Sequence, residues 1–181
     1  DGLEGCEHAV FEILSNSIDE AREGHGRLIT VTRYLDHSVE VEDQGRGCPV
    51  DWNEKEKRWN WELVFCELYA GGKYGNNEGE NYEFSLGLNG LGSCATQYAS
   101  AYMDVTVWRD GFEYQLHFKK GSITGKKGQE LEKTPLARRR TGTRTRWLPD
   151  LEVFTDIDIP AEYFAGVMKR QAVVNAGITF R

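Results

Sequence analysis

The sequence predicts an α+β domain in which helices are layered on one mixed, mostly antiparallel sheet. Stretches with helical periodicity are separated by short runs in which apolar and polar residues alternate, as in strands with one buried face. Two of these runs flank Asp110-Gly111, a two-residue turn that is typical of an antiparallel hairpin. Together these observations favour helices packed on a sheet that contains several hairpins.

One long helix and two strands are expected in the first part of the chain. Apolar residues at three- and four-residue steps predict a helix over 4–23, and glycines just beyond it end the helix. Alternation predicts strands over 28–34 and 38–42. The glycines and the proline of 43–49 indicate a loop.

A helical pattern resumes over 61–69. The stretch 70–92 is rich in glycine, asparagine and charge, and it is too long for an ordinary connection, which is typical of a functional lid. Small residues predict a helix over 93–101, and the two hairpin strands follow over 103–109 and 112–119.

The last part of the chain begins with a polar, basic loop over 126–140. Alternation predicts a strand over 141–148, and a helix is expected over 162–176, after Pro160. A further strand is expected from residue 178 onward.

Length and charge limit the class of protein. The chain has 181 residues, the size of about one domain, and needs neither a disulfide nor a metal to fold. Lys and Arg number 22 and Asp and Glu 29, which gives a net charge of -7. This balance argues against a surface devoted to gripping a long phosphate backbone, but it allows a local pocket for a polyanion.

The cysteines and the apolar runs indicate the compartment. Cys6, Cys48, Cys66 and Cys94 are far apart and have no zinc-ligand spacing, so we expect reduced thiols in a cytoplasmic protein. No apolar run approaches the ~20 residues that a membrane span requires, so no membrane partner is expected. The chain starts at Asp1 without a methionine, so we expect a fragment of a longer protein.

The polar side of the first helix carries His8, Glu12, Asn16 and Asp19, which fall on one side opposite the apolar face. A solvated face is one interpretation, although such faces normally mix cations with acids. Alternatively, a glutamate one turn from a histidine and one turn from an asparagine can position a water, accept its proton and hold a metal through the amide oxygen.

Two glycine-containing motifs suggest a ligand site. Asp43-x-Gly45-x-Gly47 can be a simple turn, or it can let a flat ligand approach the backbone while the carboxylate accepts from an exocyclic amine. The G-x-x-G-x-G run over 87–92 precedes a predicted helix, where free N–H groups can cradle a phosphate. Lys73 could add a positive charge from the predicted lid.

Five motifs in this order resemble those of the GHKL ATPases. They are 10–21 (VFEILSNSIDEA), 42–49 (EDQGRGCP), 70–73 (AGGK), 87–92 (GLNGLG) and 141–143 (TGT). The pattern is similar in particular to the ATPase domain of bacterial DNA gyrase B subunits, with the topoisomerase IV subunit ParE as the second fit. The resemblance implies the two-layer GHKL (Bergerat) sandwich over 1–181, without the N-terminal arm and the transducer domain.

The resemblance also implies roles for individual residues. Glu12 would be the general base for the attacking water, and His8 would orient that water. Asn16 would coordinate Mg²⁺ on the phosphates of ATP, and Asp43 would accept from the adenine amino group beside Thr143. The other ATP-binding positions that the resemblance implies are Glu20, Arg46, Gly47, Cys48, Pro49, Lys73, Tyr82, Gly87, Leu88, Asn89, Gly90, Leu91 and Gly92.

Three residues depart from the family pattern. Leu86 replaces a lid glycine, Asn89 replaces a histidine, and Gln115 stands where an arginine is usual at the pocket mouth. By resemblance, the partners of the whole protein would be the gyrase A subunit and DNA, with ATP-dependent homodimerisation and ATP-competitive inhibitors. The fragment is expected to bind ATP as a monomer and to turn it over slowly.

Two alternatives stay open from the sequence. The chain could be another GHKL protein, such as a histidine kinase, a MutL protein or a chaperone of the ninety-kilodalton heat-shock class. It could also be a non-catalytic nucleotide-binding module. The basic run Arg138-Arg139-Arg140 is expected to be a solvated loop, or else a contact to DNA in the full enzyme.

Overall fold

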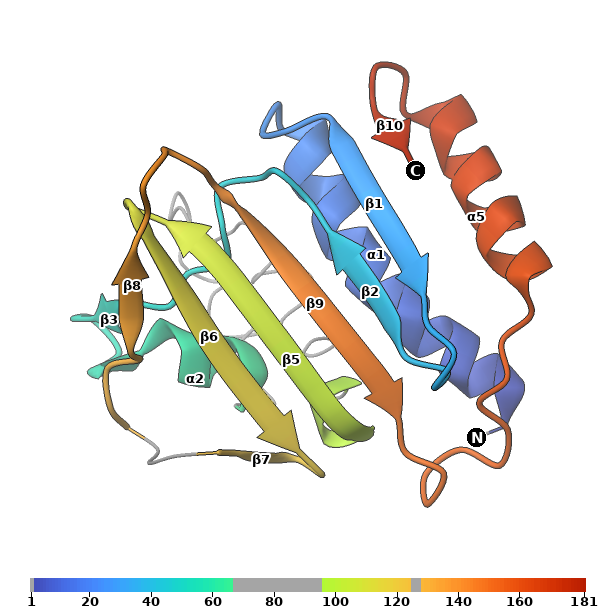
Figure 1. The fold of residues 1–181 in the computed structure, drawn as a ribbon, viewed down its shortest axis with the longest axis horizontal. Coiled ribbons are helices and arrows are strands. Elements are labelled where there is room, and N and C mark those ends of the chain that lie inside the picture. Colours follow the sequence, from blue (N-terminus) through green and yellow to red (C-terminus); the bar gives the residue numbers. More distant parts are fainter. Residues whose placement is uncertain (1, 67–95, 125–127) are drawn as a thin grey trace.

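An eight-stranded sheet forms the centre of the computed structural model, which describes residues 2–66, 96–124 and 128–181 (Figure 1). The strand order is β10-β1-β2-β9-β5-β6-β7, with β8 paired to β6. Among the described strands only β1 and β10 pair in parallel, which confirms the mixed, mostly antiparallel sheet. The strands are β1 Leu28–Arg33, β2 Val39–Glu42, β5 Ser100–Arg109, β6 Phe112–Lys119, β7 Ser122–Ile123, β8 Lys133–Pro135, β9 Gly142–Pro149 and β10 Thr179–Phe180.

Within the residues that the structure describes, the second layer contains α1 Leu3–Arg22, α2 Asn60–Phe65 and α5 Ala161–Val174, at three of the predicted helical segments. Figure 1 shows α1 behind β1, β2 and β9, and α2 behind β5 and β6. The C-terminal helix α5 packs beside α1, where the hydroxyl of Tyr163 donates a 3.0 Å hydrogen bond to the carbonyl of Glu7.

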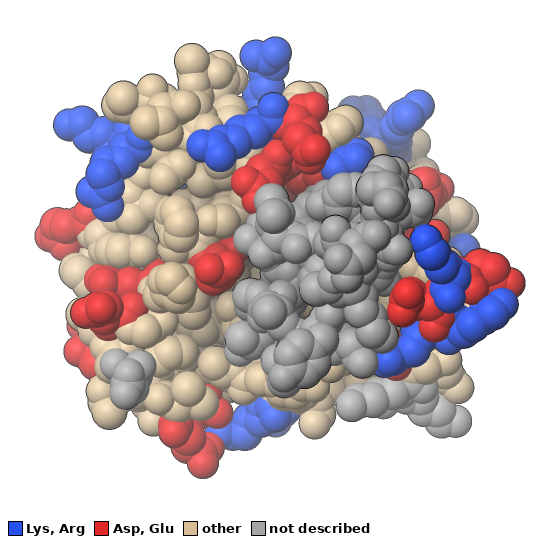
Figure 2. Space-filling view, turned by 180° about the vertical axis from the view of Figure 1, so that it is seen from behind, with Lys and Arg blue, Asp and Glu red and all other residues tan. Residues whose placement is uncertain are grey.

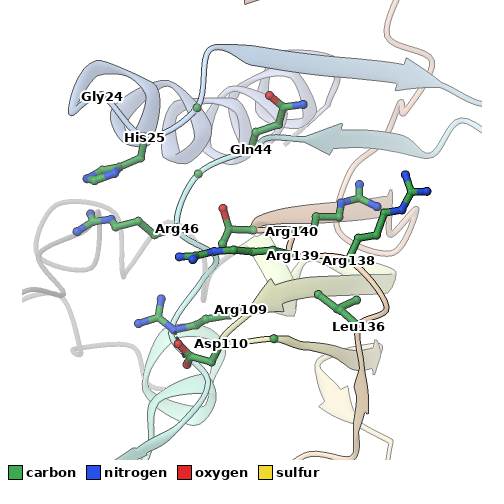
Figure 3. Close-up of a pocket in the computed structure, with 14 residues that line it drawn as sticks. Gly24, His25, Gln44, Arg46, Arg109, Asp110, Leu136, Arg138, Arg139 and Arg140 are labelled. Atoms are coloured by element: carbon green, nitrogen blue, oxygen red, sulfur yellow. Dashed lines mark ion pairs between the residues drawn. The ribbon is translucent and has the colours of Figure 1, made fainter.

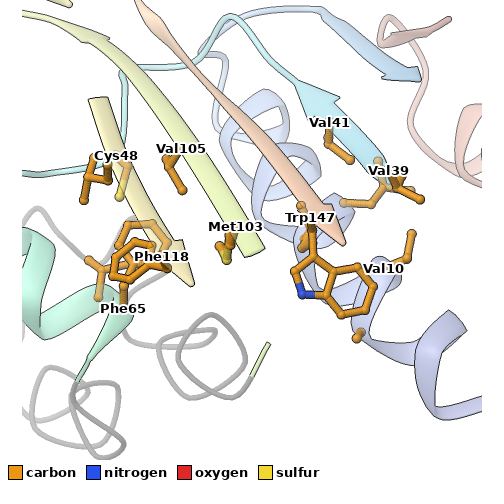
Figure 4. Packing of buried hydrophobic residues seen from close by; sticks show 14 of the residues in the cluster. Val10, Val39, Val41, Cys48, Phe65, Met103, Val105, Phe118 and Trp147 are labelled. Carbon is orange, nitrogen blue, oxygen red and sulfur yellow. The ribbon is translucent and has the colours of Figure 1, made fainter. Parts of the chain in front are cut away.

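The core lies between these two layers because the strands alternate as the sequence predicts. Val39 and Val41 of β2 are buried against α1, whereas Glu40 and Glu42 point to the other face of the sheet. Trp147 of β9 is fully buried near the centre, and Figure 4 shows it beside apolar side chains from several elements.

Two predicted elements differ from the structure. The helix expected over 93–101 is helical only over 96–98 among its described residues, because β5 begins at Ser100. Pairing of β5 with β9 overrides the local preference for helix there. The loop expected over 126–140 contains β8, an edge strand whose three residues are all exposed and show no apolar alternation.

A small second sheet precedes α2 and was not expected from the sequence. It consists of β3 Trp52–Asn53 and β4 Arg58–Trp59, whose two tryptophans meet edge to face with ring centroids 5.2 Å apart. The predicted lid over 70–92 lies outside the described residues. Within the described residues, no helix is long and apolar enough to cross a membrane.

Candidate functional site

The polar ridge of α1 runs from solvent into the protein. His8, Glu12, Asn16 and Glu20 follow one another at four-residue steps and so share one side of the helix. The exposed fraction of the side chain falls from 76% at His8 to 30% at Glu12 and 2% at Glu20. The ridge is therefore most exposed at its N-terminal end, and Asn16 and Asp19 of the predicted polar side are half-buried.

Asp43 lies directly after β2 and is buried against α1. Its Oδ2 atom accepts a 2.6 Å hydrogen bond from the hydroxyl of Ser17. Its Oδ1 atom accepts from the backbone N–H groups of Gly45, at 2.9 Å, and of Thr143, at 3.2 Å. Burial raises the pKa of the Asp43 carboxyl, these three hydrogen bonds lower it, and the charge of Glu20 raises it.

The structure brings Asp43 and Thr143 together, as the sequence analysis expected. The backbone N–H of Asp43 donates to the carbonyl of Thr143 at 2.9 Å, and the Thr143 hydroxyl oxygen accepts from the N–H of Cys48 at 2.9 Å. Gly142 has a φ of 146°, and a Cβ atom there would lie 2.3 Å from the carbonyl oxygen of Asp43. Only glycine permits this close approach.

The loop over 43–49 is held in place by Glu20 and Arg46. The Oε2 atom of Glu20 accepts from the backbone N–H of Arg46 at 2.9 Å and from its Nε at 3.1 Å, and Oε1 lies 2.6 Å from Nη2. The neighbouring Gly47 has a φ of 90°, and a Cβ atom there would lie 2.6 Å from the carbonyl oxygen of Trp108. Burial raises the pKa of the Cys48 thiol to about 12, so this thiol of the loop stays uncharged.

The N-terminal part of the ridge holds the predicted base. His8 Nε2 and Glu12 Oε1 are 3.8 Å apart, and the Oδ1 atom of Asn16 is buried. Glu12 precedes Ser17 by five residues, which corresponds to about 7.5 Å along the helix axis. The Glu12 carboxylate therefore lies nearer the N-terminus of α1 than the point at which Asp43 contacts the helix.

Several predicted site residues belong to a segment that the structure does not describe. Lys73, Tyr82 and the run from Gly87 to Gly92, together with Leu86, lie outside the described residues. Gln115 is an exposed residue of β6 whose side chain contacts those of Thr106 and Glu113.

Two residues at the site were missed by the sequence analysis. Ser17 falls on the apolar side of the helix, where a buried hydroxyl requires a partner. Arg109 ends β5, and its Nη1 atom donates a 2.6 Å hydrogen bond to the carbonyl of Gly47. The position of Arg109 before the hairpin turn does not predict its contact with Gly47, because this contact depends on packing between segments that are distant in the sequence.

Comparison with known proteins gives the family. No family model matches the chain. The chain is 37% identical over 180 residues to the chloroplastic/mitochondrial DNA gyrase B protein of Oryza sativa and 38% identical over 178 residues to the DNA gyrase B protein of a Synechocystis strain. It is also 38% identical over 177 residues to the DNA topoisomerase 4 B protein of Salmonella typhimurium.

These alignments cover 98%, 98% and 96% of the chain, but the chain spans only 24%, 16% and 27% of the respective relatives. The crystal structure of the 43K ATPase domain of Thermus thermophilus gyrase B, in complex with an aminocoumarin, matches with a TM-score of 0.81 and 29% identity. The match covers 99% of the chain and 43% of that structure. The chain is therefore a homologue of the B subunits of DNA gyrase and topoisomerase IV, with the fold of the gyrase B ATPase domain.

Proposed function

We propose that this chain binds and hydrolyses ATP as the nucleotide-binding module of the B subunit in a type II DNA topoisomerase. The observation that carries the proposal is the buried carboxylate of Asp43, which α1, the loop after β2 and the start of β9 hold from three directions. The similarity to gyrase B and topoisomerase IV B sequences supports the same function.

Adenine recognition follows from the hydrogen-bonding capacity left at Asp43. An ionised carboxylate offers about four acceptor sites, and the three hydrogen bonds within the protein leave room for a donor such as the adenine amino group. The Thr143 hydroxyl uses its oxygen to accept from Cys48, so its proton can be donated to a ring nitrogen or to a bridging water. Together, the Asp43 carboxylate and the Thr143 hydroxyl would recognise the edge of adenine that carries the amino group.

Water activation is assigned to Glu12, with His8 as a positioning residue. The carboxylate of Glu12 is one-third exposed on the ridge, so a water can reach it and give up a proton to it. His8 lies one turn away, at 3.8 Å, and can hold the Glu12 carboxylate or the water in position. Phosphoryl transfer asks the protein mainly for such positioning and for charge neutralisation.

The residues present fit a magnesium ion bound mainly by the nucleotide. Mg²⁺ is usually held by one or two protein oxygens together with substrate phosphates and waters. The amide oxygen of Asn16 is a hard ligand of this kind, and on α1 it follows Glu12 by one turn and precedes Ser17, the partner of Asp43. Among the described residues no group of three or more His, Cys, Asp and Glu could form a separate metal cage. When bound, the ion would neutralise phosphate charge.

The partners of the whole protein are inferred from its relatives. We infer that the complete protein acts with the gyrase A subunit, or its counterpart, on DNA, and that ATP binding dimerises this domain. The similar Thermus thermophilus structure contains an aminocoumarin, and we expect such a compound to compete with ATP here. Lys73, Tyr82 and the glycine-rich run over 87–92 are proposed to contact the sugar and the phosphates.

A comparison of ATP and GTP tests the proposal. Guanine presents an acceptor oxygen where adenine presents an amino group, so the Asp43 carboxylate would repel it. Isothermal titration of this chain in the presence of Mg²⁺ should show binding of ATP and at least 10-fold weaker binding of GTP. Equal affinities for the two nucleotides, or no binding of ATP, would overturn the proposal.

A further inference from the structure

A pocket of about 850 Å³ opens beside the loop after β2, where the end of α1, the β5–β6 turn and the segment before β9 meet. Figure 3 shows arginine side chains around it. Five arginines and a single acid, Asp110, are among its described lining residues. The arginines are Arg46, Arg109, Arg138, Arg139 and Arg140.

Two of these arginines already have acidic partners. Arg46 pairs with the buried Glu20 at 2.6 Å. Arg109 lies 3.6 Å from Asp110 and also donates to the carbonyl of Gly47. These two guanidinium groups are therefore fixed in the wall of the pocket rather than free to move.

Arg140 is fixed as well, by contacts with two strands. Its Nη2 atom donates to Oε2 of Glu42 at 2.9 Å. Its guanidinium also stacks over the ring of Trp108, 3.5 Å from the ring centroid. Arg140 covers this face of Trp108, which is only 2% exposed although it lies on the face of the sheet opposite to the helices.

Arg138 and Arg139 differ from the other three. Both are exposed, and within the described parts of the chain neither forms a hydrogen bond or an ion pair. Acids and cations are interspersed on the helix-bearing face (Figure 2), and the chain as a whole carries a net charge of -7. Arg138 and Arg139, which have no acidic partner among the described residues and lie next to three other arginines, therefore depart from this mixed distribution of charge. A bound anion would reduce the repulsion between these cations.

We propose that this pocket is a second anion site, in which Arg138 and Arg139 bind a chain of phosphates. The guanidinium fork matches phosphate oxygens bidentately, and the volume lies in the range of small-ligand sites. Asp43, Ser17 and Thr143 of the proposed adenine site do not line this pocket, whereas Arg46, an ATP-binding position that the resemblance implies, lies in the wall between the two. The phosphates can belong to a free polyphosphate compound or to the backbone of DNA.

The test compares two double variants of this chain with equal loss of charge. Arg138→Ala/Arg139→Ala removes the unpaired cations of the pocket, and Lys169→Ala/Arg170→Ala removes two exposed cations of α5. Binding of inorganic tripolyphosphate is measured by isothermal titration, and binding of a short labelled DNA duplex by fluorescence anisotropy over a series of salt concentrations. ATP affinity verifies that each variant keeps the nucleotide site.

The proposal expects the pocket variant to lose at least 10-fold in affinity for one probe, while the α5 variant loses less than 2-fold. A loss confined to tripolyphosphate identifies a free phosphate compound as the ligand. A loss for the duplex, with a salt dependence shallower by about two because each lost phosphate contact removes about 0.9 from the slope, identifies DNA. Equal losses in both variants, or no loss for either probe, would overturn the proposal.

Discussion

The hydroxyl of Ser17 donates a 2.6 Å hydrogen bond to Oδ2 of Asp43, and both residues are buried. This bond joins the middle of α1 to the loop that follows β2. It is also one of the three hydrogen bonds that stabilise the ionised carboxylate of Asp43. They oppose burial, which raises the pKa of this group. The proposed adenine acceptor therefore depends on a helix residue that does not itself need to contact the ligand.

Ser17→Ala is expected to destabilise the chain by about 1–2 kcal/mol at pH 7, because the ionised Asp43 loses a donor. The Asp43 pKa is already above its ordinary value, and the variant raises it further. The loss is thus largest above that pKa and shrinks as the pH falls through it and the carboxyl becomes protonated. Urea unfolding at pH 7 and pH 4.5 measures the difference. Ser15→Ala on the same helix is the control, and a loss independent of pH would contradict this role.

Glu12→Gln tests the proposed general base. Nucleotide affinity should change little, whereas phosphate release by the full-length protein should fall by about 10²–10⁴-fold because the water loses its proton acceptor. Glu4→Gln, an exposed carboxylate on the same helix, should leave both unchanged. Wild-type turnover in the Glu12 variant would remove this residue from the mechanism.

Glu20→Gln tests how the loop over 43–49 is held. The variant keeps the size of the side chain but removes the charge that faces the Arg46 guanidinium, so we expect a loss of about 2–3 kcal/mol in the free energy of unfolding. Glu23→Gln is the matched control, since Glu23 is 56% exposed and lies 3.4 Å from the same guanidinium. It should cost less than about 0.5 kcal/mol. Equal losses in a denaturant titration would mean that the buried pair does not hold the loop.

Cys6 and Cys48 are expected to resist alkylation in the folded chain. Burial raises the pKa of each thiol to about 12, so only about one molecule in ten thousand carries the thiolate at pH 8. Cys66 is only half-buried and provides an internal comparison. Mass spectrometry after iodoacetamide treatment should find Cys66 modified before Cys6 and Cys48, and labelling of Cys48 as early as Cys66 would contradict its burial.

The sequence predicted those parts of the fold in which local pattern and packing agree. The structure confirms α1, β2 and the Asp110-Gly111 hairpin. The periodicity of α1 and the alternation of β2 follow the buried face of each element, and the hairpin turn has its own local sequence pattern. The exposed edge strand β8 has no such face, and β5 begins earlier than predicted because pairing with β9 determines its start. Neither effect is visible in a local stretch of sequence.

The same distinction applies to the site. The ridge of α1 was visible because its polar residues repeat at the helical period. The contact of Arg109 with Gly47 joins residues 62 positions apart, so spacing along the chain cannot reveal it. The pairing of Asp43 with Thr143 was expected only through resemblance to a family, for the same reason.

Asp43→Asn is the most direct test of the account, because an amide can keep the acceptor for the N–H groups of Gly45 and Thr143 but presents a donor to the adenine amino group. The measurement is ATP affinity by isothermal titration, with urea unfolding of the same sample to show that the variant is folded. The account predicts a folded variant whose ATP affinity is lower by about 1–3 kcal/mol, which corresponds to 5- to 150-fold. A folded variant that binds ATP as tightly as the wild-type chain would contradict it.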